Sequence, residues 1–355
     1  MKILAVSPAQ ECTKVALYEN YDPLWIEIQT YDPSFLGTFP NIMSQEEFRV
    51  AKLKELLDAK GERLNGIQGF VATGGLLHPI EGGTYLINMS MLQDLLSCKY
   101  GESPANLGAP LAMRMAAMAG SRYAYVVDPP VVDEMGEFAH VTGLPEISRW
   151  SVFHALNMKA VAQREAINLG KKITDCNFIV CHAVETVSIG AIAGGKVIES
   201  NDVNNASGPM SLCQSGDLPP AALIDLCFSG KYTREELKSR VLRSAGLFAH
   251  FGTEDLGEIL RQVASGERKP KLLFEAFLHG IVKYIGACAA ALQGNVDAII
   301  LTGGMAAIEN FSLELSRRIS WIAPVVAYPG EDETLALVEG AIRALRGVEE
   351  PKIYA

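Results

Sequence analysis

The sequence lacks several features that mark particular classes of protein. It has no excess of positive charge, because 31 Lys and Arg stand against 41 Asp and Glu, a formal charge of −10. An acidic chain holds phosphate backbones poorly, so we expect no nucleic-acid partner. No apolar run reaches the roughly 18 residues of a membrane span, and no basic stretch followed by a long apolar one opens the chain. We therefore expect neither a membrane segment nor a secretory signal.

Cysteine patterns of the usual metal sites are also missing. The chain has seven cysteines with no C-x-x-C pair, which predicts reduced and mostly buried thiols in a cytoplasmic protein. Cys12 and Cys181 fall in turn regions without a cluster of cationic residues, so activation of either thiol has no local support.

What is present indicates a globular α/β protein of two domains. The length of 355 residues, at roughly 150 per domain, favours two, and 49% apolar with 20% charged residues is ordinary for a folded chain. Segments with strand patterns alternate with segments of helical periodicity. We expect strands at 2–6, 13–18, 68–72, 126–127, 177–181, 187–191, 196–199, 296–301 and 325–328, and helices at 46–57, 151–169, 274–292 and 334–345.

The opening pattern recurs in the second half. Residues 2–18 and 177–199 both read as antiparallel β-turn-β elements that lead into α/β units, with Gly194-Gly195 as a hairpin turn. This predicts two related domains joined near the long helix, and a cleft between domains is a common place for a ligand.

The strongest local signal is Thr302-Gly303-Gly304 after a buried strand. Glycines at such a position let a flat ligand or a phosphate approach the backbone, and the following helix presents its positive end. The alternative is a tight β-α turn that needs a positive φ.

Acidic residues provide a candidate magnesium site. Asp128 ends a strand, and Glu331 and Glu333 open the last helix; carboxylate oxygens suit Mg²⁺. The alternatives are a solvated loop acid and simple complementarity to the helix dipole. For His78 and His182, with no ligand at metal-site spacing in sequence, we expect ordinary core histidines.

Long stretches of the chain resemble butyrate kinases, in register from one end to the other. By these stretches, the chain is identified as a member of the acetate/butyrate kinase family. The stretches are Gly74–Tyr85, Val127–Glu134, Phe153–Ala162, Leu226–Thr233, Val296–Gly304 and Tyr328–Glu333.

The resemblance implies two duplicated ribonuclease-H-like domains around an interdomain nucleotide cleft, as in actin, sugar kinases and heat-shock ATPases. Residues 1–155 with a C-terminal helix at about 331–355 would form the first domain, and 156–330 the second. The implied reaction moves the γ-phosphoryl group between ATP and a short-chain carboxylate, with Mg²⁺, in a homodimer or larger assembly. The partners are then a short-chain carboxylate or acyl phosphate and ATP or ADP.

The resemblance also carries roles to individual residues. Asp128 is the retained catalytic residue, and Asp128, Glu331 and Glu333 are the Mg²⁺ ligands. The nucleotide-binding positions are Ser7, Thr13, Lys14, His182, Asp255, Thr302, Gly303 and Gly304.

Four departures from the family pattern concern the phosphate groups. Thr73 and Gln214 stand where the family has arginines, and the first turn, approximately Asn-Pro-Gly-Ser-Thr-Ser-Thr-Lys in the family, contains Glu11. The expected His-Leu-Gly-Gly-Gly is His182 followed by Ala-Val-Glu-Thr, which brings in Glu185 and removes three glycines.

Two interpretations follow. In the first, the protein is a butyrate kinase in which other residues replace the two arginines expected at positions 73 and 214, here called the phosphate clamp. Candidate substitutes are Arg114, Arg122 and Arg149. In the second, it is a catalytically impaired or silent paralogue, a pseudoenzyme that serves as a regulator or as a subunit in a hetero-oligomer with an intact kinase, and its ATP binding is weak.

Overall fold

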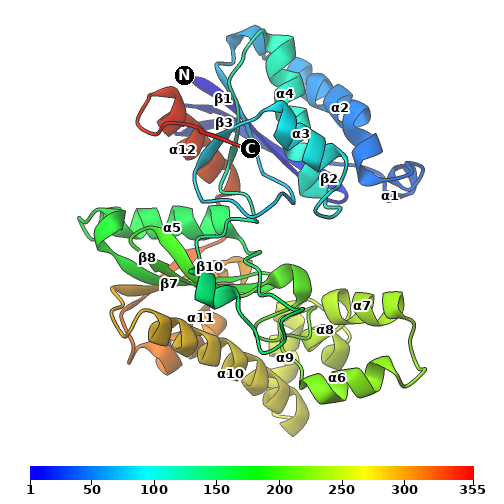
Figure 1. The fold of residues 1–355 in the computed structure, drawn as a ribbon, viewed down its shortest axis with the longest axis vertical. Helices are drawn as coiled ribbons and strands as arrows, with labels where there is room; N and C mark the ends of the chain where they lie inside the picture. The colour runs from blue at the N-terminus through cyan, green and yellow to red at the C-terminus, as the bar shows by residue number, and fades with distance from the viewer. The chain divides into compact units, whose positions relative to one another are not determined.

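Two separate units make up the chain in the computed structural model, which describes residues 1–355. The first unit comprises Met1–Asp133 and Asp332–Ala355, and the second comprises Glu134–Glu331. Each is built around its own β-sheet (Figure 1).

The first unit contains a seven-stranded sheet in the order β12-β5-β6-β4-β1-β2-β3. Strands β1, β2 and β3 form an antiparallel meander, and β4 and β6 continue from β1 in parallel. The strands are β1 Lys2–Pro8, β2 Cys12–Glu19, β3 Asp22–Thr30, β4 Gly69–Ala72, β5 Thr84–Leu86, β6 Ala124–Val127 and β12 Lys352–Ile353.

Helices cover both faces of this sheet. Helix α12 (Glu333–Leu345) packs on β1, β4 and β6, while α4 (Gly108–Ala119) packs on the same strands and on α2 (Glu46–Ala59). Figure 1 shows α12 on one side of the sheet and α2, α3 (Met89–Leu96) and α4 on the other; α1 (Pro33–Leu36) follows β3. The last helix of the chain thus packs in the same core as the N-terminal strands.

The second unit contains a five-stranded sheet in the order β11-β10-β7-β8-β9. Strands β7, β8 and β9 again form an antiparallel meander, and β10 and β11 continue in parallel. The strands are β7 Asn177–Ala183, β8 Val187–Ala193, β9 Lys196–Ser200, β10 Ala298–Gly303 and β11 Val325–Pro329.

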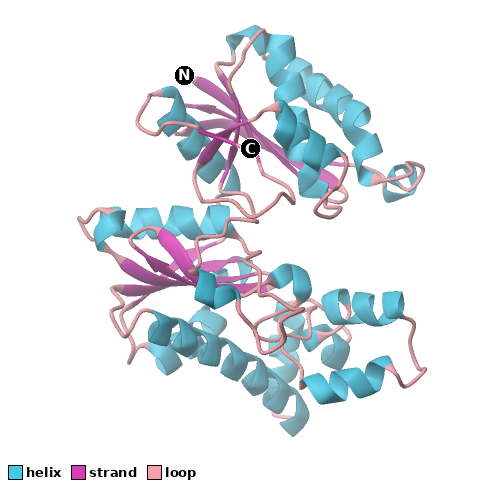
Figure 2. Cartoon of the chain, viewed as in Figure 1, coloured by secondary structure: helices cyan, strands magenta, loops and turns pink.

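The helices of the second unit also lie on both sheet faces (Figure 2). Helix α5 (Ala155–Asn168) packs on β7 and β10, and α10 (Arg268–Ala291) packs on β7, β8 and β9. The others are α6 Pro220–Cys227, α7 Arg234–Arg243, α8 Gly246–Phe251, α9 Leu256–Ala264 and α11 Glu309–Ile319.

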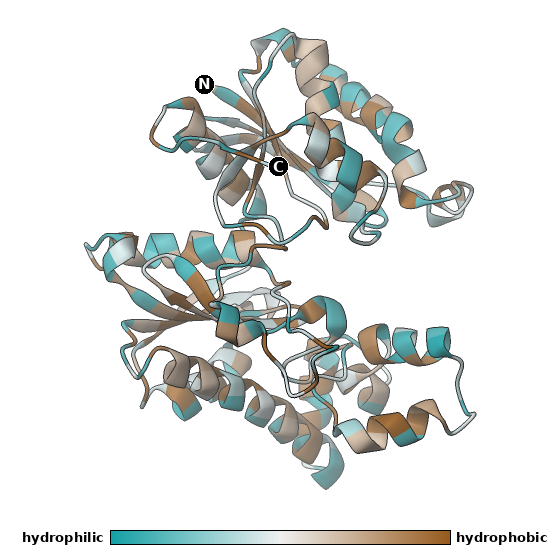
Figure 3. Cartoon of the chain, viewed as in Figure 1, coloured by the Kyte–Doolittle hydropathy of each residue, from teal (hydrophilic) through white to brown (hydrophobic).

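Helix α10 is long and apolar, as its colouring in Figure 3 indicates. It is the one helix that by length and composition alone could cross a membrane, a test that core helices of globular proteins also pass. Six of its residues, among them Phe277 and Ile281, are buried against the second sheet and its neighbours.

The two units repeat one arrangement of strands. The order β6-β4-β1-β2-β3 in the first sheet corresponds strand for strand to β11-β10-β7-β8-β9 in the second, with the same parallel and antiparallel pairings. The expected α/β class with a duplicated core is confirmed, and so are both predicted β-turn-β openings.

Other expectations needed adjustment. Strand β3 was not expected because it is an exposed edge strand, in which Leu24, Ile26 and Ile28 point to solvent. The predicted helix over 151–169 begins only at Ala155, since the backbone of His154 is not helical, with φ −78° and ψ 59°.

Candidate functional site

The Thr-Gly-Gly motif lies at the end of β10, as the sequence predicts. Gly303 has a φ of 88°, and a Cβ there would lie 2.4 Å from the carbonyl oxygen of Ala183 at the end of β7. A Cβ on Gly304 would meet nothing within 4 Å. Gly303 is therefore required by the fold, whereas Gly304 leaves the backbone open to a ligand.

This difference gives a prediction for two matched variants. Gly303→Ala should destabilise the protein by about 2 kcal/mol or more, because it combines a clash with a left-handed backbone. Gly304→Ala should change stability by no more than about 0.5 kcal/mol and weaken ATP binding instead. Thermal unfolding and calorimetric titration with ATP measure both effects; equal stability losses would contradict the assignment.

Thr302 is completely buried and fixes the chain that follows β11. Its hydroxyl donates to the carbonyl oxygen of Gly330 at 3.3 Å and accepts from the Asn157 amide at 3.1 Å. Gly303 and Gly330 also exchange two backbone hydrogen bonds. These bonds tie the Gly330-Glu331 turn to the end of β10, so that both belong to one edge of the second sheet.

Two histidine rings and a carboxylate come together beside this edge. The ring of His182, at the end of β7, stacks on that of His154 with 4.1 Å between centroids and 21° between planes. Nε2 of His182 lies 2.7 Å from Oε1 of Glu331. The ligand atoms of all three side chains lie within 4.8 Å of one another.

The two histidines for which an ordinary core role was expected have different surroundings. The His78 ring nitrogens reach the carbonyl oxygens of Pro79 and Ala355, and its ring stacks on Tyr354. The His182 side chain is completely buried, yet neither ring nitrogen has a hydrogen bond of normal geometry. Such an unsatisfied buried group is unusual and points to a use beyond packing.

His154 is held in its neutral form. Burial of the ring, with the His182 ring beside it, lowers the pKa of His154 well below its usual range, and Glu331 only partly opposes this. Nδ1 of His154 lies 2.8 Å from the Ser188 hydroxyl, which fixes the orientation of the ring.

The pKa of His154 predicts a loss of stability in acid. Below about pH 6.5 the unfolded chain takes up a proton that folded His154 does not, so unfolding becomes easier as the pH falls. One such group contributes about 1.4 kcal/mol per pH unit. His154→Gln should flatten the dependence of Tm on pH on this acid side, and His279→Gln, at an exposed histidine, should not; equal slopes would refute the assignment.

The arginine positions of the family pattern hold neutral side chains that the fold uses otherwise. Gln214 is buried, and its amide donates to the carbonyl oxygen of Val203 at 2.8 Å. Thr73 directly follows β4, and its buried hydroxyl has no hydrogen-bond partner. Neither position offers a cation to its surroundings.

Asp128 occupies a distorted position at the end of β6. Its φ is 38°, in the left-handed region, and its side chain is 7% exposed. Oδ1 accepts from the backbone N–H of Gly83 at 2.7 Å. An aspartate tolerates this backbone better than most residues, and its carboxylate is the kind of group that binds Mg²⁺. Glu333 opens α12 in the same unit, and Glu331 belongs to the second.

The turn between β1 and β2 is built around a buried arginine that the sequence did not indicate. Arg49 of α2 is completely buried and donates to the carbonyl oxygens of Ala9, Gln10 and Cys12 at 2.9 to 3.0 Å. It also donates to the Thr13 hydroxyl at 3.1 Å.

The predicted binding residues of this hairpin have different surroundings. Ser7 and Lys14 pair across β1 and β2 and are half-buried, whereas Thr13 is completely buried under the hydroxyl of Tyr31. Glu11 lies exposed at the tip of the turn. In the second unit Glu185 has the corresponding place between β7 and β8.

The remaining predicted nucleotide-binding residue, Asp255, has a structural task. It is the N-cap of α9, and its Oδ1 accepts from the backbone N–H groups of Gly257 and Glu258 at 2.8 and 3.2 Å. Its carboxylate caps the N-terminus of α9.

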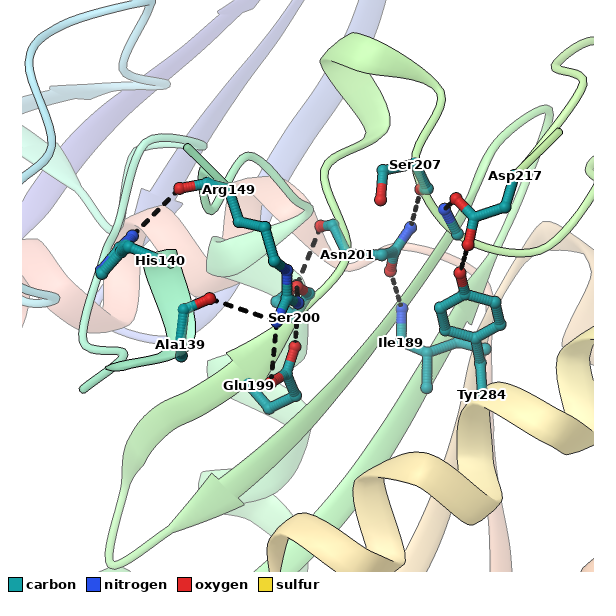
Figure 4. A network of polar contacts seen from close by, with 11 residues as sticks. Ala139, His140, Arg149, Ile189, Glu199, Ser200, Asn201, Ser207, Asp217 and Tyr284 are labelled. Carbon is teal, nitrogen blue, oxygen red and sulfur yellow. Dashed lines mark hydrogen bonds and ion pairs between the residues drawn. The ribbon is translucent and has the colours of Figure 1, made fainter. Parts of the chain in front are cut away.

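The three candidate substitute arginines have local partners. Arg114 pairs with Glu46 and Glu47, and Arg122 contacts Tyr123. Figure 4 shows that Arg149 pairs with Glu199 and reaches the carbonyl oxygens of Ala139 and Ser200.

Thiol chemistry has no support in either unit. All seven cysteines are free thiols, and burial raises the pKa of Cys181 to about 12, so that this thiol stays protonated.

Two signals in the sequence could have found more of this site. His154 directly precedes the helix that begins at Ala155, and Asn157 lies in the first turn of that helix, so both fall at one helix end. An arginine on the apolar side of the predicted helix over 46–57 is a mismatch that could have singled out Arg49.

Comparison with known proteins gives full-length matches. Butyrate kinase 2 of Clostridium acetobutylicum is 41% identical over 353 residues, 99% of each chain. The probable butyrate kinase 2 of Caldanaerobacter subterraneus subsp. tengcongensis is 39% identical over the same length. Residues 144–318 match the acetokinase family.

Solved structures share the fold at lower identity. An acetate kinase of Porphyromonas gingivalis superposes with a TM-score of 0.79 at 20% identity, over 97% of this chain and 99% of its own. A propionate kinase of Francisella tularensis gives 0.74 at 16% identity, over 96% and 98%. The likeness shows the duplicated ribonuclease-H-like fold that the two sheets already indicate.

Proposed function

Because the chain belongs to the acetokinase family, with butyrate kinases as full-length relatives, we propose that it is an ATP:short-chain-carboxylate phosphotransferase of weakened activity. The reaction is butyrate plus ATP to butyryl phosphate plus ADP, or the reverse. The observation that carries the proposal is 41% identity over 99% of both chains. We place the protein in the cytoplasm, as a homodimer or larger assembly.

The adenosine side of the nucleotide site is retained in this proposal. Gly304 leaves the backbone open at the end of β10, and Thr302 with Gly303 holds that edge in place. His182, another predicted nucleotide-binding residue, lies near the end of the neighbouring strand β7, opposite Thr302.

The carboxylates of Asp128, Glu331 and Glu333, which we assign to a divalent ion, are the donor type that Mg²⁺ prefers. In the first unit, Asp128 is nearly buried at a strand end. When bound, the ion would neutralise charge on the phosphate groups.

The two replaced arginine positions of the phosphate clamp limit the proposed activity. Phosphoryl transfer depends on positioning and on positive charge around the transferred group, and an arginine at such a site is worth about 10³-fold or more. Neither Thr73 nor Gln214 supplies positive charge, and the Gln214 amide donates to the carbonyl oxygen of Val203. Glu11 and Glu185 add negative charge at the two hairpin turns.

The same four positions favour a second candidate function. A catalytically silent subunit keeps the fold and loses the groups that act on phosphate, and this chain has that pattern. Such a subunit would act as a regulator or would assemble with an intact kinase. Size-exclusion chromatography of the protein alone and mixed with an intact butyrate kinase separates the two assemblies.

One assay tests the proposed activity. Purified protein, Mg-ATP and butyrate are incubated with hydroxylamine, which traps acyl phosphate as a hydroxamate. We expect slow formation of the hydroxamate, at least about 10³-fold below an intact butyrate kinase run in parallel. No product above a protein-free control would leave the silent subunit as the function, and a normal rate would show a rebuilt clamp.

A further inference from the structure

Helices α6 and α7 of the second unit form an exposed arm, residues 218–243, at one side of that unit (Figure 1). No residue of α6 is buried, and Leu237 is the one buried residue of α7. Helix α6 is nevertheless apolar, as its colour in Figure 3 shows. The large apolar side chains that the arm exposes are Leu218, Ile224 and Phe228.

The arm has too little packing of its own to be stable without a cover. Helix α6 has eight residues, and so short a helix is marginal in water unless its apolar face packs on something. Ile224 and Phe228 are four residues apart and therefore share one face, and Phe228 is 87% exposed. The arm thus presents an apolar face that requires a partner.

A loop of the same unit, residues 137–150, exposes a second set of apolar side chains. The N–H of Arg149 donates to the carbonyl oxygen of His140 at 2.9 Å, which closes the loop. The Arg149 guanidinium donates to the carbonyl oxygen of Ser200 in β9 at 3.2 Å (Figure 4). The backbone is therefore fixed, and fixed apolar display of this kind is typical of an interface. The exposed side chains, at every third position, are Phe138, Val141, Leu144, Ile147 and Trp150.

Hydrogen bonds connect the loop to the arm. The N–H of Val203 donates to the carbonyl oxygen of Val152, just after the loop, at 2.9 Å. The Gln214 amide donates to the carbonyl oxygen of Val203 at 2.8 Å. The N–H of the next residue, Ser215, donates to the carbonyl oxygen of Val241 in α7 at 3.0 Å. The two apolar surfaces are thus held at a fixed spacing within one unit.

The charges around the two surfaces are of opposite sign. Residues 218–243 contain five Lys and Arg against three Asp and Glu, although the whole chain has a charge of −10. In the loop, Glu137 and Glu146 are exposed, while Arg149 is paired with Glu199. A positive arm in an acidic chain fits an acidic partner, and the loop of a second copy combines acidic groups with an apolar surface.

We propose that the arm of one copy packs on residues 137–150 of a second copy, whose arm packs on the same loop of the first. Such a two-fold contact uses both surfaces of each copy. The eight large apolar side chains, at about 100 Å² each, expose about 800 Å² per copy, the area that a stable interface buries on each partner. The inference rests on the assembly of two or more copies proposed above and names the surface that forms it.

The dissociation constant of the full-length protein, measured by sedimentation equilibrium, tests this surface. Phe228→Asp in the arm and Phe138→Asp in the loop should each raise it at least about 30-fold, the effect of a central interface residue. Val348→Asp and Leu313→Asp, at exposed apolar positions elsewhere, should leave it unchanged.

The outcomes separate the surface from the proposed function. A native protein that is monomeric would contradict both the assembly and the surface, and a dimer that both variants leave intact would contradict the surface alone. Circular dichroism confirms that each variant is folded. The hydroxamate assay decides the proposed activity independently, since neither surface contains a residue assigned to the nucleotide or the metal.

A cross-link tests which surface meets which. Cys227 is an exposed thiol on the arm, and Phe138→Cys places a second thiol in the loop. Mixed ¹⁴N- and ¹⁵N-labelled chains are oxidised mildly and their peptides identified by mass spectrometry. We expect a disulfide from Cys227 to position 138 of the other chain, and none to position 348 in a Val348→Cys control. Absence of this link, or a Cys227–Cys227 disulfide in its place, would overturn the proposed pairing.

Discussion

A variant with both arginines restored and both turn acids removed should bind ATP more tightly and phosphorylate butyrate faster than the native protein. The changes are Thr73→Arg, Gln214→Arg, Glu11→Thr and Glu185→Gly. We expect a gain of at least about 10³-fold in the hydroxamate rate, because one arginine at a phosphoryl-transfer site is worth that much.

Two physical effects act together in this variant. A carboxylate about 4 Å from a phosphate oxygen costs about 4 kcal/mol at an effective dielectric constant near 20, before screening. Removing Glu11 and Glu185 ends that repulsion, and the new guanidinium groups offer paired N–H donors to phosphate. Both effects weaken with salt, so calorimetric titrations with ATP must share one ionic strength.

A control variant separates local from overall charge. Asn65→Arg, Gln93→Arg, Glu55→Thr and Glu350→Gly change the net charge equally at exposed positions. ATP binding by this control should stay at the native level. If the native protein already binds ATP at micromolar concentration and turns over normally, a substitute clamp exists and the proposed weakness is wrong.

Replacement of Arg49 by methionine should cause the largest loss of stability of any single change considered. The guanidinium donates to three carbonyl oxygens of the β1–β2 turn and lies 5.0 Å from the Tyr31 ring. Methionine keeps only an apolar stem, so the carbonyl oxygens of Ala9 and Gln10 lose the guanidinium as a donor, and that of Cys12 keeps only the Ala9 N–H. Breaking such a network costs about 3–5 kcal/mol, which lowers Tm by roughly 10 °C at 2–4 °C per kcal/mol.

Arg114→Met is the matched control for Arg49→Met. Arg114 pairs with Glu46 and Glu47 on the exposed side of the neighbouring helix, where an ion pair contributes about 1 kcal/mol or less. Differential scanning calorimetry at one pH compares the two proteins. Similar shifts of Tm would show that the carbonyl oxygens of the turn find water or another donor, and that Arg49 does not hold it.

The local sequence pattern was sufficient to predict much of the fold. Buried strands such as β1, β7 and β10 are short runs of branched apolar residues, and α2 and α12 have helical periodicity, so their positions follow from the chain itself. Edge strand β3 shows why the positions of other elements could not be predicted from the local pattern. Its residues lie mostly exposed, and its pairing with β2 comes from contacts that no local pattern records.

The candidate site divides in the same way. Thr302-Gly303-Gly304 can be recognised because the need for glycine is local: a strand ends and the backbone turns with a positive φ. The replaced positions Thr73, Gln214, Glu11 and Glu185 are likewise visible in the sequence. Their surroundings are not, since the hydrogen bond of Gln214 to Val203 joins residues eleven positions apart through a loop.

The sequence by itself determined the family, the duplicated α/β class and the four substitutions at the phosphate positions, because each of these is written in contiguous residues or in a repeated pattern. Only the tertiary structure decided that His154, His182 and Glu331 share one point and that Arg49 holds the β1–β2 turn. The reason is physical. Stacked rings and a buried guanidinium depend on distances between segments 28 to 40 residues apart, and the contact of His182 with Glu331 joins residues 149 apart. Those distances exist only after the sheets have formed.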